Sequence, residues 1–396
     1  MSTAEKSADT SAGSQSPNAV ALLMLILMSD PLQALLFVCP GPVLTTISQH
    51  FGPSAGLFGV QMIMSTPGLG IILGGWPAGR LVQRFGAPRM LAFALPTYAL
   101  CGAACLVIDS LGALLLSRLL QGCATACVAS AALTLVAERG AEGQARLLSW
   151  QAALGALAGL LVMPLAGWLG ETHGWRAPFA IYLLALVMWL LALPWLVRSP
   201  ASKEEPRAPG PNYSLLHLWP LLLAVVVIFS VVFMRATLQP FVLAEAGLTR
   251  PIEQAWVLTL DCLANALGAL TFAVLVRRIA PQKCLHLCLL VLGAGDILLG
   301  ASSLPVLLTG ICISSSAAGF AGPCLAHMVL NRAGPSLRRT ASGLMFTAIY
   351  LGDFINPVLT GPLRQLFGIH GVFVAVGLLC MVGGAVVTVR NRVSLA

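Results

Sequence analysis

Residues 81–91, LVQRFGAPRML, and residues 275–285, LVRRIAPQKCL, are two copies of one short basic segment. They align without gaps at an offset of 194 residues, so that Arg84 corresponds to Arg278. A long apolar run precedes each copy, and another follows it. Such self-similarity at a fixed period predicts a chain built from two related halves.

A second region supports the same period. Gly159 and Pro164 match Gly352 and Pro357 at an offset of 193 residues. If each repeat forms a bundle with an even number of helices, the two bundles keep the same orientation. This arrangement predicts two helical bundles with a binding site between them.

The composition is that of a membrane protein. Of the 396 residues, 58% are hydrophobic and only 9% are charged, whereas soluble proteins average about 25% charged residues. Charge-free runs such as 31–79 and 208–234 exceed the roughly 20 residues that a helix needs to cross the hydrocarbon. A soluble enzyme, a disordered chain and a nucleic-acid binder are therefore excluded, and so is an outer-membrane barrel with its short alternating strands.

Charge clusters and Gly/Pro turns divide the apolar runs into predicted spans. The fold class that we expect is an all-α integral membrane protein with twelve transmembrane helices in two six-helix bundles. The spans are 19–46, 56–78, 88–108, 111–135, 147–170, 175–197, 214–243, 254–276, 284–303, 305–330, 340–363 and 370–389.

The basic residues predict the orientation. If both termini are cytoplasmic, 17 of the 22 Lys and Arg residues lie in inner segments, three lie in outer loops, and two fall within spans. Cytoplasmic segments of membrane proteins carry such an excess of Lys and Arg. The net charge of +8 thus reports topology, and it requires no nucleic-acid partner.

The polar stretches predict the domain organisation. Residues 1–18 have the composition of a disordered cytoplasmic tail, and 198–213 that of a flexible cytoplasmic linker. The linker separates an N-terminal bundle, 19–197, from a C-terminal bundle, 214–390, which is followed by a short tail, 391–396. We expect a monomer in the cell membrane, and a bacterial inner membrane in particular.

Several motifs resemble those of the major facilitator superfamily. Residues 79–89, GRLVQRFGAPR, resemble its cytoplasmic signature, and Gln83 stands where the family has an aspartate. Residues 113–122, ALLLSRLLQG, resemble the fourth-helix motif around a buried arginine. Residues 155–168 and 174–179 resemble the fifth-helix motif and the entry to the sixth helix in the family's drug:proton antiporters. The resemblance implies a two-bundle transporter fold.

The resemblance also implies a conformational gating role for parts of these motifs. In the cytoplasmic signature and the fifth helix, the residues concerned are Gly79, Gln83, Arg84, Gly86, Arg89, Gly155, Gly159, Pro164 and Gly167. The spacing Gly155-x-x-x-Gly159 places small residues on one helix face, where helices approach closely, and Pro164 interrupts backbone hydrogen bonding. The same glycines are also compatible with simple helix packing.

Six charged residues fall within predicted spans, where each costs about 2.5–3.5 kcal/mol on insertion scales and is a functional candidate by default. They are Asp30, Arg118, Arg235, Asp261, Asp296 and Asp353. In the resembled fold the helices that carry five of them line or flank the cavity. Helix nine is peripheral there, so we expect Asp296 to be structural.

Asp30 and Arg118 are the first candidates for proton coupling. Apolar surroundings favour the neutral form of an acid and a nearby arginine favours its charged form, so a change in their distance would load and release a proton. The resembled exporters often carry an acid on helix one and the arginine on helix four. A static ion pair between two helices is the alternative. Asp353 is a second proton-coupling candidate.

Arg235 and Asp261 are expected in the substrate cavity. Two cavity arginines would favour a substrate with a carboxylate, because guanidinium binds carboxylate bidentately. Alternatively, Arg235 neutralises Asp261 or Asp353 and touches no substrate. Gln61, Asn265 and Tyr350 are expected to add polar contacts to the cavity.

These features predict a secondary active transporter, not an enzyme. The leading hypothesis is a proton-coupled exporter of a small amphipathic organic compound by alternating access. Export of an anionic metabolite or siderophore-like chelator, proton symport, and a non-transporting membrane sensor are alternatives. No phosphate-binding loop of the Walker type occurs in the sequence, so we expect a proton gradient as the energy source, with no cofactor and no metal. The expected partners are the substrate, protons and the lipid bilayer.

Overall fold

The computed structural model describes residues 17–52, 56–139, 141–198 and 215–393. Within these ranges the chain is helical, with turns between the helices and no strand. Residues 199–213 of the predicted linker, 1–16 of the predicted N-terminal tail and 394–396 of the predicted C-terminal tail lie outside the described residues.

The helices of the N-terminal half are α1 (Pro17–Leu27), α2 (Ser29–Val38), α3 (Leu44–Phe51), α4 (Gly56–Phe85), α5 (Ala87–Ala103), α6 (Leu111–Ala137), α7 (Ala141–His173) and α8 (Leu184–Arg198). Short 3-10 turns at Gly41–Val43, Ala104–Leu106 and Ala177–Leu183 join some of them. The C-terminal half has a 3-10 turn, Leu215–Leu218, followed by α9 (Trp219–Glu245), α10 (Pro251–Leu275), α11 (Pro281–Leu299) and α12 (Leu304–Val393).

The expected single first span, 19–46, is divided into α1, α2 and α3. Pro31 lies in the first turn of α2, Pro40 directly precedes the 3-10 turn that follows α2, and Pro42 lies within that turn. Proline lacks the N–H that continues a helix and crowds the preceding turn. The first span therefore bends where the prolines fall, although its whole length is apolar enough to cross a membrane.

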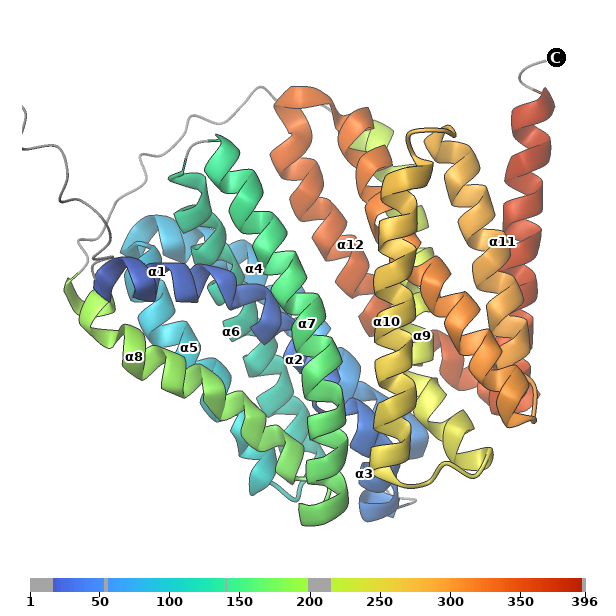
Figure 1. The fold of residues 1–396 in the computed structure, drawn as a ribbon, viewed down its shortest axis with the longest axis horizontal. Coiled ribbons are helices and arrows are strands. Elements are labelled where there is room, and N and C mark those ends of the chain that lie inside the picture. The colour runs from blue at the N-terminus through green and yellow to red at the C-terminus, as the bar shows by residue number, and fades with distance from the viewer. Residues whose placement is uncertain (1–16, 53–55, 140, 199–214, 394–396) are drawn as a thin grey trace, which may run out of the picture.

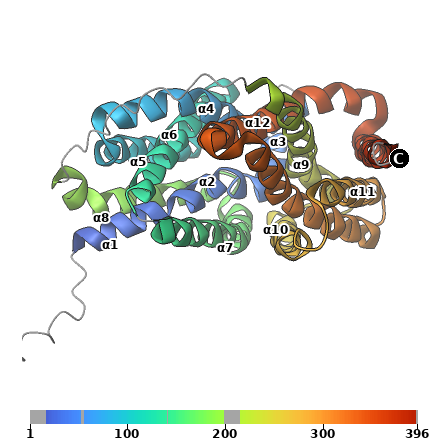
Figure 2. The same ribbon diagram turned by 90° about the horizontal axis from the view of Figure 1, so that it is seen from above.

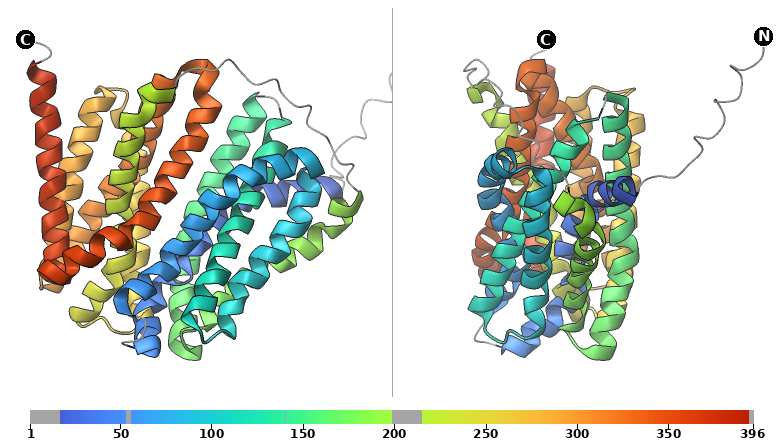
Figure 3. Two further views of the ribbon diagram at one scale, coloured as in Figure 1. Left: turned by 180° about the vertical axis from the view of Figure 1, so that it is seen from behind. Right: turned by 90° about the vertical axis from the view of Figure 1, so that its left-hand side faces the viewer.

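Eleven helical stretches among the described residues are long and apolar enough to cross a membrane. The last one, Thr340–Ala385, has 46 residues, about 69 Å of helix at 1.5 Å per residue, against roughly 30 Å of hydrocarbon. It therefore does not run straight across. Gly368 has a φ of 69° within it, and the final part of α12 turns back alongside α11 (Figure 3).

The two copies of the repeated segment occupy equivalent places. Residues 81–91 span the junction from α4 to α5, and 275–285 span the junction from α10 to α11. Gly86 is the only residue between α4 and α5, and its φ of 84° suits a residue without a side chain. Both copies thus form tight connections between two apolar helices.

Each half has its own hydrophobic core, and the contact between the halves is narrower. One buried cluster extends from Ala21 to Leu196 and the other from Leu218 to Cys380. Between the halves, α7 packs against α10 and α4 packs against α12 (Figure 2). Val38, Met163 and Leu258 form a small separate buried cluster at the α7–α10 contact.

The two halves meet mainly at one end of the molecule. Their ribbons approach each other where α7 ends and α10 begins, and they diverge toward the end where α4 joins α5 (Figure 1). We refer to these as the Pro251 end and the Gly86 end.

Candidate transport site

Asp353 lies where α12 of the C-terminal half meets α4 of the N-terminal half, and its side chain is fully buried. The Ser65 hydroxyl donates a 3.0 Å hydrogen bond to its Oδ1. A Cβ added to Gly68 would lie 2.5 Å from Oδ2, so only a glycine leaves room for the carboxyl group there. Among the described residues, Oδ2 has no hydrogen-bond partner. The acid therefore bridges the halves and retains capacity to bind.

Other polar groups surround Asp353 at the same contact. One turn earlier in α12, Tyr350 accepts a hydrogen bond from Gln33 of α2, a second polar link between the halves. One turn later, Asn356 donates to Thr237 of α9 at 3.0 Å. Tyr350 was expected at the cavity, and Gln33, Asn356 and Thr237 are further hydrogen-bonding side chains at or beside this contact.

Gln61 precedes Ser65 by one turn of α4 and is fully buried. Neither its amide nitrogen nor its amide oxygen has a partner among the described residues, and the same holds for Oδ1 of Asn356. An unsatisfied buried polar atom costs about 1–3 kcal/mol. Groups of this kind are normally satisfied by water or by a ligand, which gives the α4–α12 contact the chemistry of a binding site.

Arg118 lies in α6 inside the N-terminal half, with no exposed surface. Its guanidinium donates to the carbonyls of Leu36 and Ile63 at 2.6 and 3.2 Å, and to Gln121 Oε1 and the Tyr182 hydroxyl at 2.6 and 2.8 Å. No described carboxylate forms an ion pair with it. The positive charge is therefore stabilised by four neutral oxygen atoms, those of two backbone carbonyls, one amide and one hydroxyl.

Asp30 is separated from Arg118 in this conformation. It faces α7, where a Cβ on Gly155 would lie 3.2 Å from its Oδ2. The static ion pair considered as an alternative is thus absent between these two described residues. Gly155 leaves the space that the Asp30 side chain occupies beside α7.

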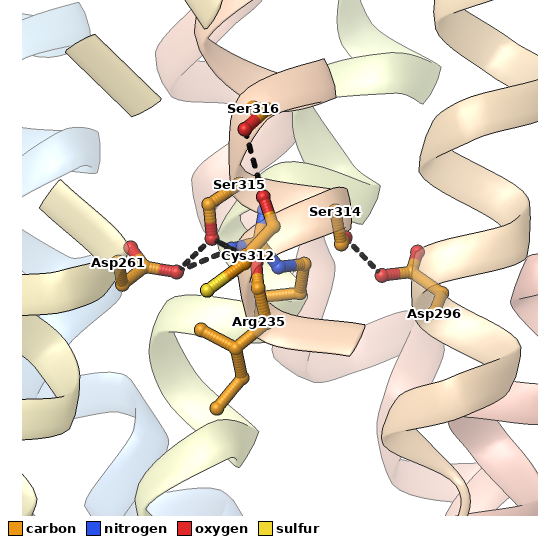
Figure 4. A network of polar contacts seen from close by, with 8 residues as sticks. Arg235, Asp261, Asp296, Cys312, Ser314, Ser315 and Ser316 are labelled. Atoms are coloured by element: carbon orange, nitrogen blue, oxygen red, sulfur yellow. Dashed lines mark hydrogen bonds and ion pairs between the residues drawn. The ribbon is translucent and has the colours of Figure 1, made fainter. Parts of the chain in front are cut away.

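Arg235 of α9 forms an ion pair with Asp261 of α10, with 2.5 Å between Nη2 and Oδ1. Ser315 of α12 lies between them: it accepts a hydrogen bond from Arg235 and donates one to Asp261 (Figure 4). Arg235 is buried and the Asp261 side chain is 25% exposed. The geometry matches the alternative in which Arg235 neutralises Asp261.

Asp296 and Asn265 also lie in the C-terminal half, and only Asp296 is fully buried. Asp296 of α11 is fully buried and accepts a 2.5 Å hydrogen bond from Ser314 of α12. Asn265 of α10 lies at a close helix contact, where a Cβ on Gly319 would be 1.8 Å from the Asn265 carbonyl oxygen. The Asn265 backbone thus packs against α12.

The Pro251 end is closed by small residues. At Gly167, α7 packs so closely against α10 that an added Cβ would lie 2.2 Å from the Ala255 Cβ and 2.9 Å from the Pro251 carbonyl oxygen. Thr45 of α3 also donates a 3.4 Å hydrogen bond to the side-chain oxygen of Gln254 in α10, which joins the two halves. Pro164 lies within α7, and Gly159 faces Cys262 of α10 at an ordinary contact distance of 3.7 Å.

An ion pair joins the halves at the same end. Arg250, just before α10, donates from Nε to Glu171 of α7 at 2.8 Å. This hydrogen bond, with the charge of Glu171, raises the pKa of Arg250, so the guanidinium is charged at every physiological pH. The pair spans the two halves on the surface, where Arg250 is 60% exposed.

The signature residues lie at the opposite end and are open to solvent or headgroups. Gln83, Arg84 and Arg89 are exposed, as is Gly79. Neither arginine forms an ion pair with another residue that the structure describes. Among the described residues, no ion pair joins the two halves at the Gly86 end in the way that Arg250 and Glu171 do at the Pro251 end.

Several site residues escaped the sequence analysis because they are small or uncharged. Ser65, Gly68 and Ser315 were not distinguished from packing residues, and neither were Gln121 and Tyr182. The only available signal was their position: Gln121 follows Arg118 by three residues, which places both on one face of a helix. Partners from distant helices left no such signal.

Two matching segments of the chain, residues 32–249 and 221–394, fit the sequence pattern described as Major Facilitator Superfamily. Together they cover most of the sequence. The chain belongs to the Major Facilitator Superfamily. It is therefore a multi-pass membrane transporter of that superfamily and not an enzyme.

Curated relatives within the superfamily match only part of the chain. The multidrug efflux pump Tap of Mycobacterium tuberculosis strain H37Rv is 26% identical over 138 residues, 35% of this chain and 33% of the pump. Tap of Mycolicibacterium fortuitum is 27% identical over 143 residues, 36% of this chain and 35% of the pump. The match thus spans about a third of each relative's length.

Solved superfamily structures match nearly the whole chain in fold. A bacterial homologue of the human lysosomal transporter Spinster, inward-facing and occupied, has a TM-score of 0.76 at 15% identity, covering 96% of this chain and 98% of that one. Its unoccupied inward-facing form has a TM-score of 0.71 at 16% identity, with 96% of each chain covered. A mutant of the nucleoside transporter NupG has a TM-score of 0.68 at 15% identity, covering 93% and 99%.

Proposed function

We propose that this transporter is a proton-coupled exporter that moves a small amphipathic organic compound by alternating access, with Asp353 as the principal proton-binding residue. The chain would cross the membrane twelve times, and both termini and the linker would be cytoplasmic. In this orientation the closed Pro251 end faces outward, so that the described conformation is inward-facing.

The position of Asp353 carries the proposal. An acid with no counter-ion, buried between two halves that move relative to each other, is protonated at one stage of a cycle and deprotonated at another when its access to water changes. Ser65 and Gly68 on the opposite half make the surroundings of the carboxyl group depend on how the halves are docked.

The partial match to a multidrug efflux pump supports export. Arg235 is neutralised by Asp261, and the guanidinium of Arg118 donates its hydrogen bonds inside the N-terminal half, so neither arginine is free to bind an anionic substrate. The unpaired carboxylate and amides at the α4–α12 contact instead favour neutral or cationic compounds with hydrogen-bond donors. We therefore place export of an anionic metabolite second.

The test is gradient-driven flux in proteoliposomes with an imposed pH gradient and a panel of cationic, neutral and carboxylate compounds. Wild type is compared with Asp353→Asn, Asp30→Asn and Arg118→Ala. We expect Asp353→Asn to abolish flux driven by the pH gradient while exchange of substrate for substrate continues, because an amide keeps the shape of the site and binds no proton.

Asp109→Asn is the matched control. Asp109 is an acid with a 72% exposed side chain outside the apolar helices, and its substitution should leave flux unchanged. Gradient-driven flux at the wild-type rate in all three test variants would refute the assignment of proton coupling to these residues.

A further inference from the structure

A second group of charged side chains lies in the C-terminal half, away from the α4–α12 contact. Arg235 of α9, Asp261 of α10 and Asp296 of α11 surround the serines at the start of α12, with Arg235 drawn between the two acids (Figure 4). The proposed function gives no role to Asp296, which the sequence analysis treated as structural.

Two consecutive serines connect the acids to one helix. Ser315 donates to Asp261 and Ser314 donates to Asp296. Consecutive residues of a helix point about 100° apart, at 3.6 residues per turn. The first part of α12 therefore holds one acid on each of two adjacent sides, and Arg235 reaches the same place from α9.

The hydrogen bonding in this group is incomplete. Among the described residues, Nε of Arg235 has no acceptor and Oδ2 of Asp296 has no donor, although both atoms are buried. Arg235 thus has a free donor and Asp296 a free acceptor within one cluster. Leaving buried polar atoms unpaired is unfavourable, so an arrangement that joins these two atoms would recover a hydrogen bond.

The two acids differ in access. Asp261 is 25% exposed, whereas Asp296 is sealed. Tight helix packing around Asp296 explains this: a Cβ on Gly295 would lie 2.5 Å from the Ser314 nitrogen, and one on Gly293 would lie 2.5 Å from the Gly377 carbonyl oxygen. Besides Arg235, the titratable group that faces Asp296 is the Cys380 thiol of the last part of α12.

Charge balance determines how many protons the group holds. It contains one cation and two acids, and an uncompensated buried charge is far less stable than a neutral group. The group is neutral when it binds one proton. In this conformation Arg235 neutralises Asp261, and no described cation lies within ion-pair distance of Asp296.

We propose that Asp261 and Asp296 form a second proton-binding site that shares the single cation Arg235. In the described conformation Asp261 is ionised and paired with Arg235, and Asp296 carries the proton. When Asp261 binds a proton or a cationic substrate, Arg235 is released, turns to Asp296 and stabilises its carboxylate, and the Asp296 proton leaves to the water next to Asp261. One cation bound at Asp261 is thus exchanged for one proton from Asp296.

The link to export depends on the proposed function, whereas the proton-binding site does not. The test therefore measures protonation directly, by infrared absorption of the purified protein at a pH of about 7, where exposed carboxyl groups are ionised. The C=O stretch of a protonated carboxyl group is separate from the carboxylate bands. Asp353→Asn is used as the parent protein, so that Asp353 makes no contribution.

Asp296→Asn in this parent should remove the absorption of one protonated carboxyl group. Asp261→Asn should remove the same absorption, although Asp296 is still present, because the freed Arg235 then pairs with Asp296 and ionises it. Asp109→Asn, the surface control, should leave the absorption unchanged.

A protonated carboxyl absorption that keeps its full parent intensity in the Asp296→Asn variant would overturn the proposal. A band that is lost there but retained at full strength with Asp261→Asn would overturn the shared cation, because Asp296 would then be protonated whatever its neighbours do. If Asp296→Asn fails to fold, Ser314→Ala serves instead. It removes a neutral donor, so the Asp296 band should shift to higher frequency, and an unshifted band would refute the assignment.

Discussion

Gly68 shows how a residue without a side chain shapes the candidate site. Its Cα faces the Asp353 carboxyl group across the contact between α4 and α12, and a methyl group there would lie 2.5 Å from Oδ2 and 3.4 Å from the Tyr350 ring. Oδ2 is on a short side chain within a helix and has little room to retreat. The glycine is therefore needed for the docking of Asp353, although it has no side chain with which to bind the carboxyl group.

We expect Gly68→Ala to slow proton-driven flux by about tenfold or more, which corresponds to about 1.4 kcal/mol. The methyl group would displace the carboxyl group from Ser65 and separate the halves at this point. Gly75→Ala, on the same helix but with no atom within 4 Å of the added Cβ, is the control. Equal initial rates for both variants in proteoliposomes would contradict this role of Gly68.

At the level of elements, the contact between α7 and α10 is set by Gly167. Since its added methyl group would overlap Ala255 and approach the Pro251 backbone, Gly167→Ala should force the helices apart at the Pro251 end. We expect several-fold faster hydrogen–deuterium exchange in peptides covering 163–173 and 251–262. Gly112→Ala of α6, with open space around the added methyl group, should leave these peptides unchanged. Unaltered exchange in the Gly167 variant would mean that the contact can relax by other movements.

The lengths of the apolar helices were predictable, whereas their breaks were not. Hydrocarbon requires about 20 apolar residues per crossing, so composition alone locates the helices. Pro31, Pro40 and Pro42 were visible in the sequence, but prolines also occur within intact helices here, as Pro67 and Pro77 do in α4. Which proline ends a helix depends on whether neighbouring helices satisfy the freed backbone groups, and those neighbours are distant in sequence.

The candidate site was predictable in its charges and not in its pairings. Charged residues in apolar runs stand out, and the six found in the sequence include every acid assigned above to a proton-binding site. Their partners depend on the rotation of each helix about its axis. Asp30 and Arg118 were predicted to act together, yet one faces α7 and the other faces the carbonyls of α2 and α4.

At the level of the whole molecule, the Arg250–Glu171 ion pair joins the two halves across the Pro251 end. We expect Glu171→Arg to open this end more often, because it places two cations together, and the double variant with Arg250→Glu to restore closure. Hydrogen–deuterium exchange of peptides covering 247–258 measures how often this end opens in each variant. The exposed pair is screened by salt, so the effect of the single variant should diminish at high ionic strength. A double variant that behaves as the single one would show that the ion pair does not hold this end.

Gly86 is the entire connection between α4 and α5, and its left-handed backbone conformation fixes the angle at which the second helix leaves the first. Because a single residue joins α4 and α5, we expect the two helices to tilt together. A displacement of α4 at Ser65 would then also displace α5. A drug or antibody fragment bound to the exposed side chains of Arg84 and Arg89 beside this joint would restrain α4 without approaching Asp353.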